Sequence, residues 1–312
     1  RTERIEMLNS LNEFKKITTE GNNNSTKDID LLSTKEMLLK INDEDLGVAN
    51  AVREAIDQIT KVVDEIVDCF MHDGRLIYMG AGTSGRIGIL DSVECPPTYG
   101  VSSDMVMCLM AGGDNAFVKA VEGAEDSKTL AVEDLKNINL QANDIVIGIA
   151  ASGRTPYVIG GIEYAKEVGA KTACITTSKG SVLASIVDYP IEAVTGQEVI
   201  SGSTRMKSGT AQKLICNMLS TGSMIKMGKV YGNYMIDVMA TNEKLVARSY
   251  GIVSEITGCT QEEAKEKIEK YGTIKKALIA YFTGCEDLEV IEDALHCVKG
   301  NIRNAIKKIK GE

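Results

Sequence analysis

The stretch that decides the fold is residues 74–100, GRLIYMGAGTSGRIGILDSVECPPTYG. Residues 75–79 form a short, mostly apolar run typical of a strand. Residues 80–85 are too rich in glycine to be anything but a loop, and residues 86–93 have the pattern of a helix. The order along the chain is therefore strand, loop, helix.

This loop has the composition of an anion-binding turn. Gly80, Gly82 and Gly85 allow the backbone to come close to a ligand. Thr83 and Ser84 add hydroxyl groups where the free N–H groups of the following helix point. Because the N-terminus of a helix carries a partial positive charge, the loop favours an anionic group such as phosphate.

Further short apolar runs alternate with helical stretches, as a parallel sheet requires. We predict a doubly wound α/β fold with a five-stranded parallel sheet, whose ligands lie beyond the carboxyl ends of the strands. The other predicted strands are 105–110, 145–150, 172–177 and 190–194, and the predicted helices include 49–71, 116–121, 128–137 and 156–168.

The second loop of interest, residues 150–155, follows the run 145–150. Ser152 and Thr155 flank Gly153, and the proline at 156 suits the first turn of a helix. Helix capping alone would explain the hydroxyls, but it does not explain why Ser-Gly-Arg occurs in both loops. Two such loops on one sheet can surround a phosphate from two sides. The predicted phosphate-binding residues are Thr83, Ser84, Gly85, Ser152, Gly153 and Thr155.

Residues 80–85 also match the dinucleotide pattern G-x-G-x-x-G, which alone is a weak signal. An acidic ribose partner would have to be Asp114, nearly thirty residues past the glycines rather than about twenty. We therefore favour phosphate over a dinucleotide.

Composition limits the function classes. The 312 residues are 44% hydrophobic, enough for a sizeable core, and the net charge of -9 argues against nucleic acid as the main partner. No apolar run is long enough to span a membrane and the start has no signal-peptide pattern, so we expect a cytoplasmic protein. The eight scattered cysteines indicate buried thiols, and two histidines exclude a His-rich metal site.

Three regions follow from these patterns. Residues 1–48 form an N-terminal arm that opens with a short helix and has a second one capped at Ser33 or Thr34. Residues 49–235 form the ligand-binding domain. Residues 236–312 form a small unit of three or four short helices joined by glycine turns.

Two carboxyls suit proton transfer. Glu94 ends the first helix before Cys95-Pro96-Pro97, which we expect to forbid further helix. Glu125 lies in the acidic cluster 122–127, soon after the second strand. The close competitors are Asp91 and Glu122. Within 196–212, Arg205 is a candidate anion-binding residue by its forked geometry, with Lys207 as the weaker alternative.

The pairing of GAGTSGR with IAASGRT resembles the sugar isomerase (SIS) family of sugar-phosphate binders. The longer strings GAGTSGRIGILDSVECPPTYG, AVEGAEDS, DLKNINL, GIAASGRTPYVIGG, GSTRMKSGTAQK and ATNEKL resemble the N-acetylmuramic acid 6-phosphate etherase family, over nearly the whole chain.

That resemblance implies a lyase that removes D-lactate from C3 of N-acetylmuramic acid 6-phosphate by elimination and then adds water, giving N-acetylglucosamine 6-phosphate. It implies no metal or redox cofactor. The family's catalytic glutamates match Glu94, as the acid for the lactate oxygen, and Glu125, as the base at C2 and activator of water. It also implies a homodimer, which fits the many apolar positions of the helix 52–67.

Two other functions stay open at this point. SIS domains also serve as non-catalytic sugar-phosphate sensors, which need the hydroxyl loops but no paired glutamates. A sugar-phosphate isomerase is the third possibility. The presence of both Glu94 and Glu125 favours the lyase.

Overall fold

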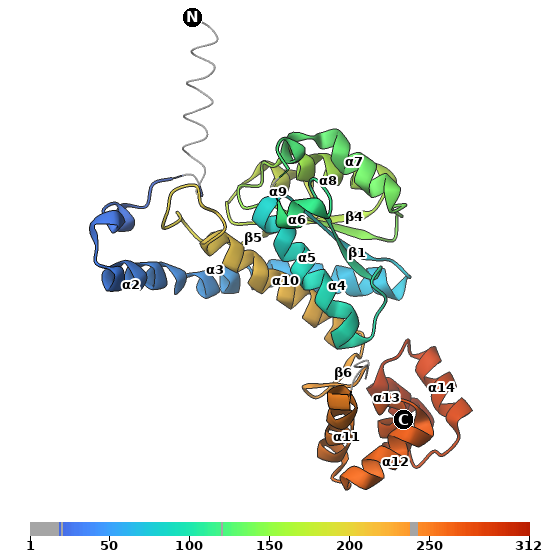
Figure 1. Cartoon of the computed structure of the whole chain (residues 1–312). Coiled ribbons are helices and arrows are strands. Elements are labelled where there is room, and N and C mark those ends of the chain that lie inside the picture. The colour runs from blue at the N-terminus through green and yellow to red at the C-terminus, as the bar shows by residue number, and fades with distance from the viewer. Residues whose placement is uncertain (1–18, 20, 120, 238–242) are drawn as a thin grey trace, which may run out of the picture. The chain divides into compact units, whose positions relative to one another are not determined.

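The computed structural model describes residues 19, 21–119, 121–237 and 243–312 of the chain (Figure 1). The helix expected near the start of the chain and residues 240–242 of the string ATNEKL lie outside the described residues. In the part that is described, no helix is long and apolar enough to cross a membrane.

Five parallel strands form one sheet in the order β2-β1-β3-β4-β5, which confirms the predicted α/β class. The strand order reverses between β1 and β3, so the crossover connections leave these neighbours on opposite sides of the sheet. The strands lie within one or two residues of the predicted runs: β1 Leu76–Gly80, β2 Val106–Met110, β3 Ile145–Ile149, β4 Lys171–Thr176 and β5 Tyr189–Glu192.

Helices cover both faces of this sheet (Figure 1). Alternate strand residues such as Ile77 and Met79 pack in a fully buried cluster with α7 (Lys128–Asn137), α8 (Pro156–Val168) and α9 (Val182–Ile186). The intervening Tyr78 points to the other face, where its hydroxyl reaches α5. That face carries α4 (Ile56–Met71), α5 (Gly82–Tyr99) and α10 (Lys207–Lys226). The short α6 (Asn115–Val118) and the 3-10 turn η4 (Ala124–Asp126) follow β2.

Helix α5 is longer than predicted at both ends. It begins at Gly82, inside the stretch predicted as a loop, and it passes through Pro96–Pro97 to Tyr99, so the expectation that the prolines forbid further helix was wrong. Proline removes a ladder hydrogen bond and crowds the preceding turn. Tertiary contacts outweigh this cost here, because the Tyr99 side chain is buried and its hydroxyl donates to Thr221 Oγ1 at 3.3 Å.

The helix predicted over residues 49–71 is two helices, α3 (Val48–Glu54) and α4. Ala55 interrupts the helical ladder with φ −90° and ψ 7°. Because Ala55 is itself buried and neither glycine nor proline stands there, packing rather than a local breaker causes the interruption.

Polar contacts tie the N-terminal arm to the segment before α10. Helix α2 (Thr34–Asp45) begins with a capping box between Ser33 and Glu36, which confirms the predicted cap. Its Glu44 carboxylate pairs with the ammonium of Lys207 at 2.7 Å. The arm is therefore fixed at this end, although α2 buries no side chain.

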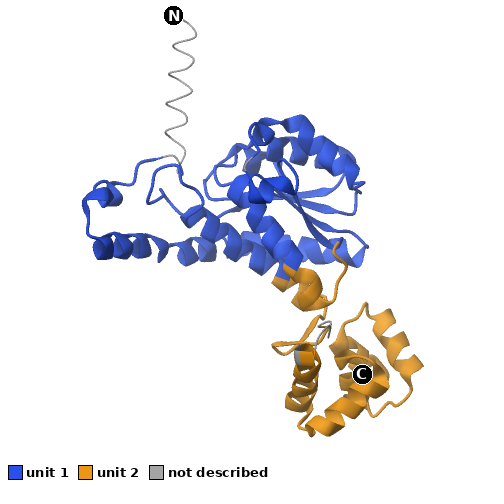
Figure 2. Cartoon of the chain, viewed as in Figure 1, with its two compact units in different colours: residues 1–93, 104–220 blue, residues 94–103, 221–312 orange. Residues whose placement is uncertain are grey.

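The chain divides into two compact units (Figure 2). Residues 1–93 and 104–220 form the unit that contains the sheet, and residues 94–103 and 221–312 form the second. The second has its own core, and in its described part it contains five helices and a hairpin rather than three or four helices alone. These elements are β6 Val230–Tyr231, β7 Tyr234–Met235, α11 Glu243–Thr257, α12 Gln261–Tyr271, α13 Ile274–Thr283, α14 Leu288–Cys297 and α15 Ile302–Lys310.

The expected burial of the cysteines holds for half of them. Cys69, Cys95, Cys174 and Cys216 are buried, whereas Cys297 is exposed. Burial raises the pKa of the Cys69 and Cys174 thiols to about 12, so both stay protonated at neutral pH.

Asp91 links the elements of the α5 face. Its carboxylate accepts hydrogen bonds from the hydroxyl of Tyr78 on β1 at 3.0 Å and from that of Ser220 on α10 at 2.9 Å. Burial raises the pKa of Asp91 to about 6, because the loss of hydration outweighs these two hydrogen bonds.

We expect Asp91 to make the fold less stable as the pH rises. Its pKa is raised above the ordinary 3.8, so its contribution to stability is complete below pH 4 and is lost through pH 6. Relative to Asp91→Asn, which does not ionise, the parent chain should lose roughly 1 kcal/mol of unfolding free energy between pH 5 and pH 7.5. Urea unfolding at both pH values measures this, and a pH-independent difference would contradict it.

Candidate active site

The stretch predicted as the first loop, residues 80–85, contains the end of β1, a very tight turn and the first turn of α5. A Cβ on Gly85 would lie 2.8 Å from the carbonyl oxygen of Gly80, so the two glycines permit the close approach. Gly82 has φ +53°, and a Cβ there would meet nothing within 4 Å. The first turn of α5 therefore opens onto free space beside the loop.

This opening is bordered by hydrogen-bond donors. The backbone N–H groups of Gly82, Thr83 and Ser84 stand in the first turn of α5, where no intrahelical carbonyl can accept them. The side chains of Thr83 and Ser84 are half-buried beside them. Because the helix dipole adds positive potential, this end of α5 can hold an anion.

The second loop, residues 150–155, lies next to the first. β3 pairs directly with β1, and Gly80 stands opposite Ile149, so both loops leave the same edge of the sheet at the same level. Gly153 has φ +65°, and a Cβ there would lie 2.3 Å from the hydroxyl oxygen of Ser181. Ser152 and Thr155 are half-buried. The structure thus brings the two predicted hydroxyl loops to one edge of the sheet.

A buried polar layer supports both loops, and the sequence pattern did not predict it. The Thr177 hydroxyl, after β4, lies 2.9 Å from the Ser208 hydroxyl of α10 and 3.2 Å from the carbonyl oxygen of Ala151. The Ser84 hydroxyl donates to Oε1 of Gln212 at 2.9 Å. The string GSTRMKSGTAQK supplies two of these partners, Ser208 and Gln212.

A carboxylate side chain of the protein caps the start of α10. Glu198 is fully buried, and its carboxylate accepts the N–H groups of Lys207 and Ser208 at 2.9 Å each. Lys207 is also buried and is paired with Glu44. Burial tends to raise the pKa of Glu44, but hydrogen bonds from Lys207 and Ser25 outweigh it and lower the pKa to about 2. Lys207 is therefore a structural ion-pair partner.

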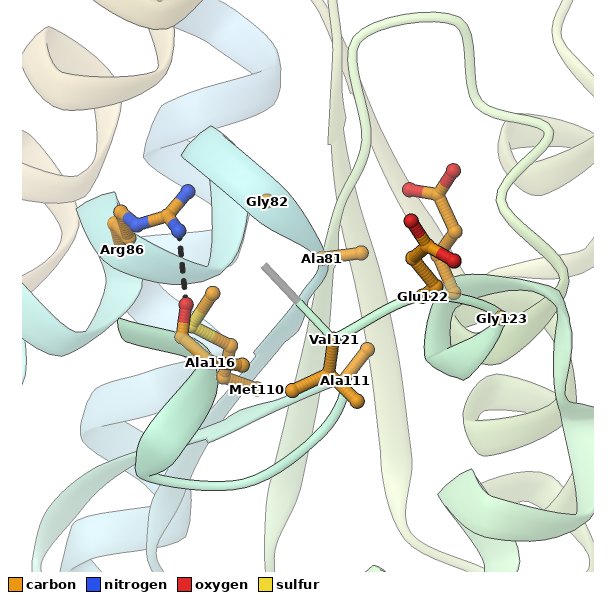
Figure 3. A pocket seen from close by; sticks show the side chains of 10 residues that line it. Ala81, Gly82, Arg86, Met110, Ala111, Ala116, Val121, Glu122 and Gly123 are labelled. Carbon is orange, nitrogen blue, oxygen red and sulfur yellow. Dashed lines mark hydrogen bonds between the residues drawn. The ribbon is translucent and has the colours of Figure 1, made fainter. Parts of the chain in front are cut away.

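A cavity of about 340 Å³ opens beside the first loop (Figure 3). One side of it is apolar, formed by small and aliphatic side chains that include Met110 and Val121, and Glu122 lies on the other side. Glu125 also lines the cavity, and both glutamates are exposed. The full lining is Ala81, Gly82, Arg86, Met110, Ala111, Ala116, Val121, Glu122, Gly123 and Glu125. The predicted base Glu125 and its competitor Glu122 thus share one cavity with the first loop.

Arg86 lines the cavity, and in the sequence it stands out only as part of the repeated Ser-Gly-Arg. Its guanidinium donates from Nε to the carbonyl of Phe117 at 2.8 Å. It also donates from Nη2 to the carbonyl of Ala116 at 2.8 Å, which Figure 3 shows. These two hydrogen bonds hold α6 against α5. Arg86 therefore shapes the part of the cavity wall that lies at α6. The repeated Ser-Gly-Arg was the sequence signal for Arg86. The carbonyl group of Ala116, which accepts one of its hydrogen bonds, lies 30 residues further along the chain.

The remaining predicted residues lie elsewhere. Glu94 stands exposed on the same helix as Ser84, ten residues further along. Arg205 is exposed in the segment before α10. Asp91, a competitor for the catalytic role, is held by Tyr78 and Ser220 and does not line the cavity. Among the described residues, no group of three His, Cys, Asp or Glu side chains could hold a metal ion.

Family models match most of the chain. Residues 58–166 match the N-terminal SIS domain of glucokinase regulatory protein, residues 125–222 match the SIS domain, and residues 232–280 match the C-terminal lid domain of glucokinase regulatory protein. Together with the five-stranded parallel sheet, these matches define the fold as SIS-type.

Curated relatives narrow this class. N-acetylmuramic acid 6-phosphate etherase of Clostridium botulinum is 53% identical over 94% of this chain and 97% of that protein, and the etherase of Bacillus cereus is 52% identical over 93% and 99%. The chain belongs to the N-acetylmuramic acid 6-phosphate etherase family. Among solved structures, a phosphoheptose isomerase from Neisseria gonorrhoeae is 15% identical with a TM-score of 0.49, covering 61% of this chain and 98% of that one.

We expect Arg86→Ala to loosen the cavity wall at α6. The change removes two hydrogen bonds from a charged donor, so amide hydrogens of residues 115–119 should exchange about 10- to 100-fold faster. Arg154→Ala, which removes the exposed arginine of the second loop, is the matched control and should leave this segment unchanged. Equal exchange in Arg86→Ala and the parent chain would show that Arg86 does not hold α6.

Proposed function

We propose that this chain cleaves the D-lactyl ether of N-acetylmuramic acid 6-phosphate, releasing D-lactate and N-acetylglucosamine 6-phosphate, as a step in the recycling of cell-wall amino sugars. The observation that carries the proposal is the cavity that joins Glu125 to the helix N-terminus of the first loop. The relatives that share at least half of its residues bear the name of this activity.

The two hydroxyl loops hold the phosphate in this proposal. The N–H groups at the start of α5 and the hydroxyls of Thr83, Ser84, Ser152 and Thr155 offer donors from two sides, with Gly85 and Gly153 allowing the backbone to approach. Arg205 is proposed as a further ligand for an anionic group of the substrate, phosphate or lactyl carboxylate.

The chemistry needs one base and one acid. With the sugar ring open, Glu125 takes the proton from C2, the C2–H electrons form a C2=C3 double bond, and the C3–O bond breaks. Glu94 donates a proton to the departing lactate oxygen. Glu125 then releases the C2 proton to solvent, and Glu94 takes up a proton from solvent. As a carboxylate again, Glu125 takes a proton from the water that adds at C3 and returns it to C2. Both glutamates are exposed in the free chain, so bound substrate must supply their desolvation.

A non-catalytic sugar-phosphate sensor is the second candidate. The matches to two domains of glucokinase regulatory protein, over residues 58–166 and 232–280, favour it. A sensor would bind the sugar phosphate in the same loops but would release no lactate. We also propose domain boundaries at residues 48 and 235 and a cytoplasmic location. Neither property distinguishes the lyase from the sensor.

We expect Glu125→Ala and Glu94→Ala to separate the two proton transfers. Glu125→Ala should lose both D-lactate release and exchange of the C2 proton with solvent, whereas Glu94→Ala should lose lactate release and retain exchange. Each loss should be ~10²–10⁴-fold, typical of a positioned acid or base. Glu133→Ala, an exposed glutamate on α7 outside the cavity, is the control and should be fully active.

Two outcomes would contradict this assignment. D-lactate release by Glu94→Ala near the parent rate would remove Glu94 from the mechanism. A parent chain that binds N-acetylmuramic acid 6-phosphate without releasing lactate would support the sensor instead. Loss of exchange only in Glu94→Ala would keep the pair of glutamates and exchange their roles.

We also propose a homodimer in which α5 and α10 meet the second copy near the active site. These adjacent helices expose four large apolar side chains, Leu90 at 47%, Val93 at 56%, Met218 at 40% and Ile225 at 51%. Clustered exposed apolar side chains mark contact surfaces.

We expect light scattering to give twice the chain mass of 33.6 kDa at assay concentration. Leu90→Glu should shift the protein toward the monomer, because it places a charge in the proposed contact, whereas Leu38→Glu on the exposed α2 should not. A mass of one chain for the parent protein would contradict the dimer.

A further inference from the structure

Gln212 is a buried amide that is only half satisfied. Its side chain is 1% exposed on α10, and its Oε1 accepts the hydroxyl hydrogen of Ser84 at 2.9 Å. Its Nε2 has no hydrogen-bond partner, one of three buried side-chain nitrogen or oxygen atoms in this condition within the described part of the chain. A buried amide donor without an acceptor is costly, so its presence beside the first loop calls for a functional reason.

The direction of this hydrogen bond affects phosphate binding. A serine hydroxyl has one hydrogen to donate. While Ser84 donates it to Gln212, that hydrogen is not available to a phosphate oxygen. A glutamine amide can also present its NH₂ to the same hydroxyl, and Ser84 would then accept from Gln212 and keep its own hydrogen for another acceptor.

We propose that Gln212 is a positioning residue that sets the donor direction of Ser84. When the phosphate group binds, the amide turns over, Nε2 donates to Ser84 Oγ, and Ser84 Oγ donates to a phosphate oxygen. The inference deepens the proposed function, on which it rests, by assigning to that site a residue that responds to phosphate without touching it.

The surroundings of Gln212 favour a rotation of the amide over a movement of the helix. Glu198 caps the start of α10, and the Thr177 hydroxyl pairs with Ser208 one turn before Gln212. A Cβ on Gly209 would lie only 3.4 Å from Cγ2 of Thr83, so α10 and the first loop are in close contact. With the backbone held on both sides, the terminal torsion of the side chain is the remaining freedom.

Two variants distinguish positioning from simple packing. Gln212→Glu replaces the amide with a carboxylate, which can only accept hydrogen bonds, so the Ser84 hydroxyl continues to donate its hydrogen to residue 212. The carboxylate also places a negative charge near the negatively charged phosphate. Gln212→Met keeps the length of the side chain but neither donates nor accepts, so Ser84 is free to turn to the phosphate. Gln141→Glu adds the same charge at an exposed site before β3, at the opposite end of that strand from the second loop, and is the matched control.

The measurement is calorimetric binding of N-acetylglucosamine 6-phosphate, with unphosphorylated N-acetylglucosamine as the comparison ligand. We expect affinity for the phosphate ester to fall about 100-fold or more in Gln212→Glu and less than about 10-fold in Gln212→Met. Affinity for the unphosphorylated sugar should change little in either. Gln141→Glu should match the parent chain.

A double-mutant cycle tests the route through Ser84. In a Ser84→Ala background, Gln212→Met should have no further effect on affinity for the phosphate ester, because the hydroxyl that it orients is gone. In the lactate assay, Gln212→Met should raise KM and leave kcat near the parent value. This cycle uses uncharged substitutions, so it decides the matter even if Gln212→Glu does not fold.

Three results would overturn the inference: equal losses in Gln212→Glu and Gln212→Met, equal losses for phosphorylated and unphosphorylated sugar, or additive effects of the Ser84 and Gln212 substitutions. Failure of the proposed function is separable from these results. A parent chain that releases no D-lactate would reject the lyase, while the binding measurements on the phosphate ester would still decide the role of Gln212.

Discussion

The parallel pairing of β1 with β3 is the constraint on which the site depends. Gly80 stands opposite Ile149, so two chain segments about seventy residues apart leave the sheet at the same level and on the same edge. A slip of the register would separate the hydroxyl groups of the two loops and would also turn the buried faces of the strands. Strands that are fully buried on both faces resist such a slip, because every residue of β1 and β3 packs against a helix layer.

Much of the fold could be predicted from the sequence because its signals are local. The strands are short apolar runs, and α7 and α8 begin and end where the pattern places them, after Ser127 and Thr155. The passage of α5 through Pro96–Pro97 could not be predicted, since it depends on burial of Tyr99 by residues far away in sequence. The break at Ala55 is invisible for the same reason.

Some features of the site could likewise be predicted from the sequence, and others could not. Glycine and hydroxyl residues indicated both loops, because a close backbone approach and a helix start each favour particular residue types. The roles of Arg86 and Gln212 could not be predicted, because they depend on partners 30 and 128 residues away that only the folded chain brings near. Lys207 was predicted as a possible anion ligand because its ion pair with Glu44 could not be foreseen. Nothing in the sequence of the N-terminal arm indicates that Glu44 contacts the start of α10.

The carboxylate of Glu198 has a consequence for how many anions the sheet edge accepts. Helices α5 and α10 both begin at this edge, and each bare helix start would attract phosphate. Since Glu198 occupies the first N–H groups of α10, that helix start is not left for an external anion, whereas the starts of α5 and α8 are. An external anion at this end of the sheet is therefore directed to the two hydroxyl loops that follow β1 and β3, and away from α10. Glu198 thus acts as a permanent internal competitor for phosphate at the start of α10.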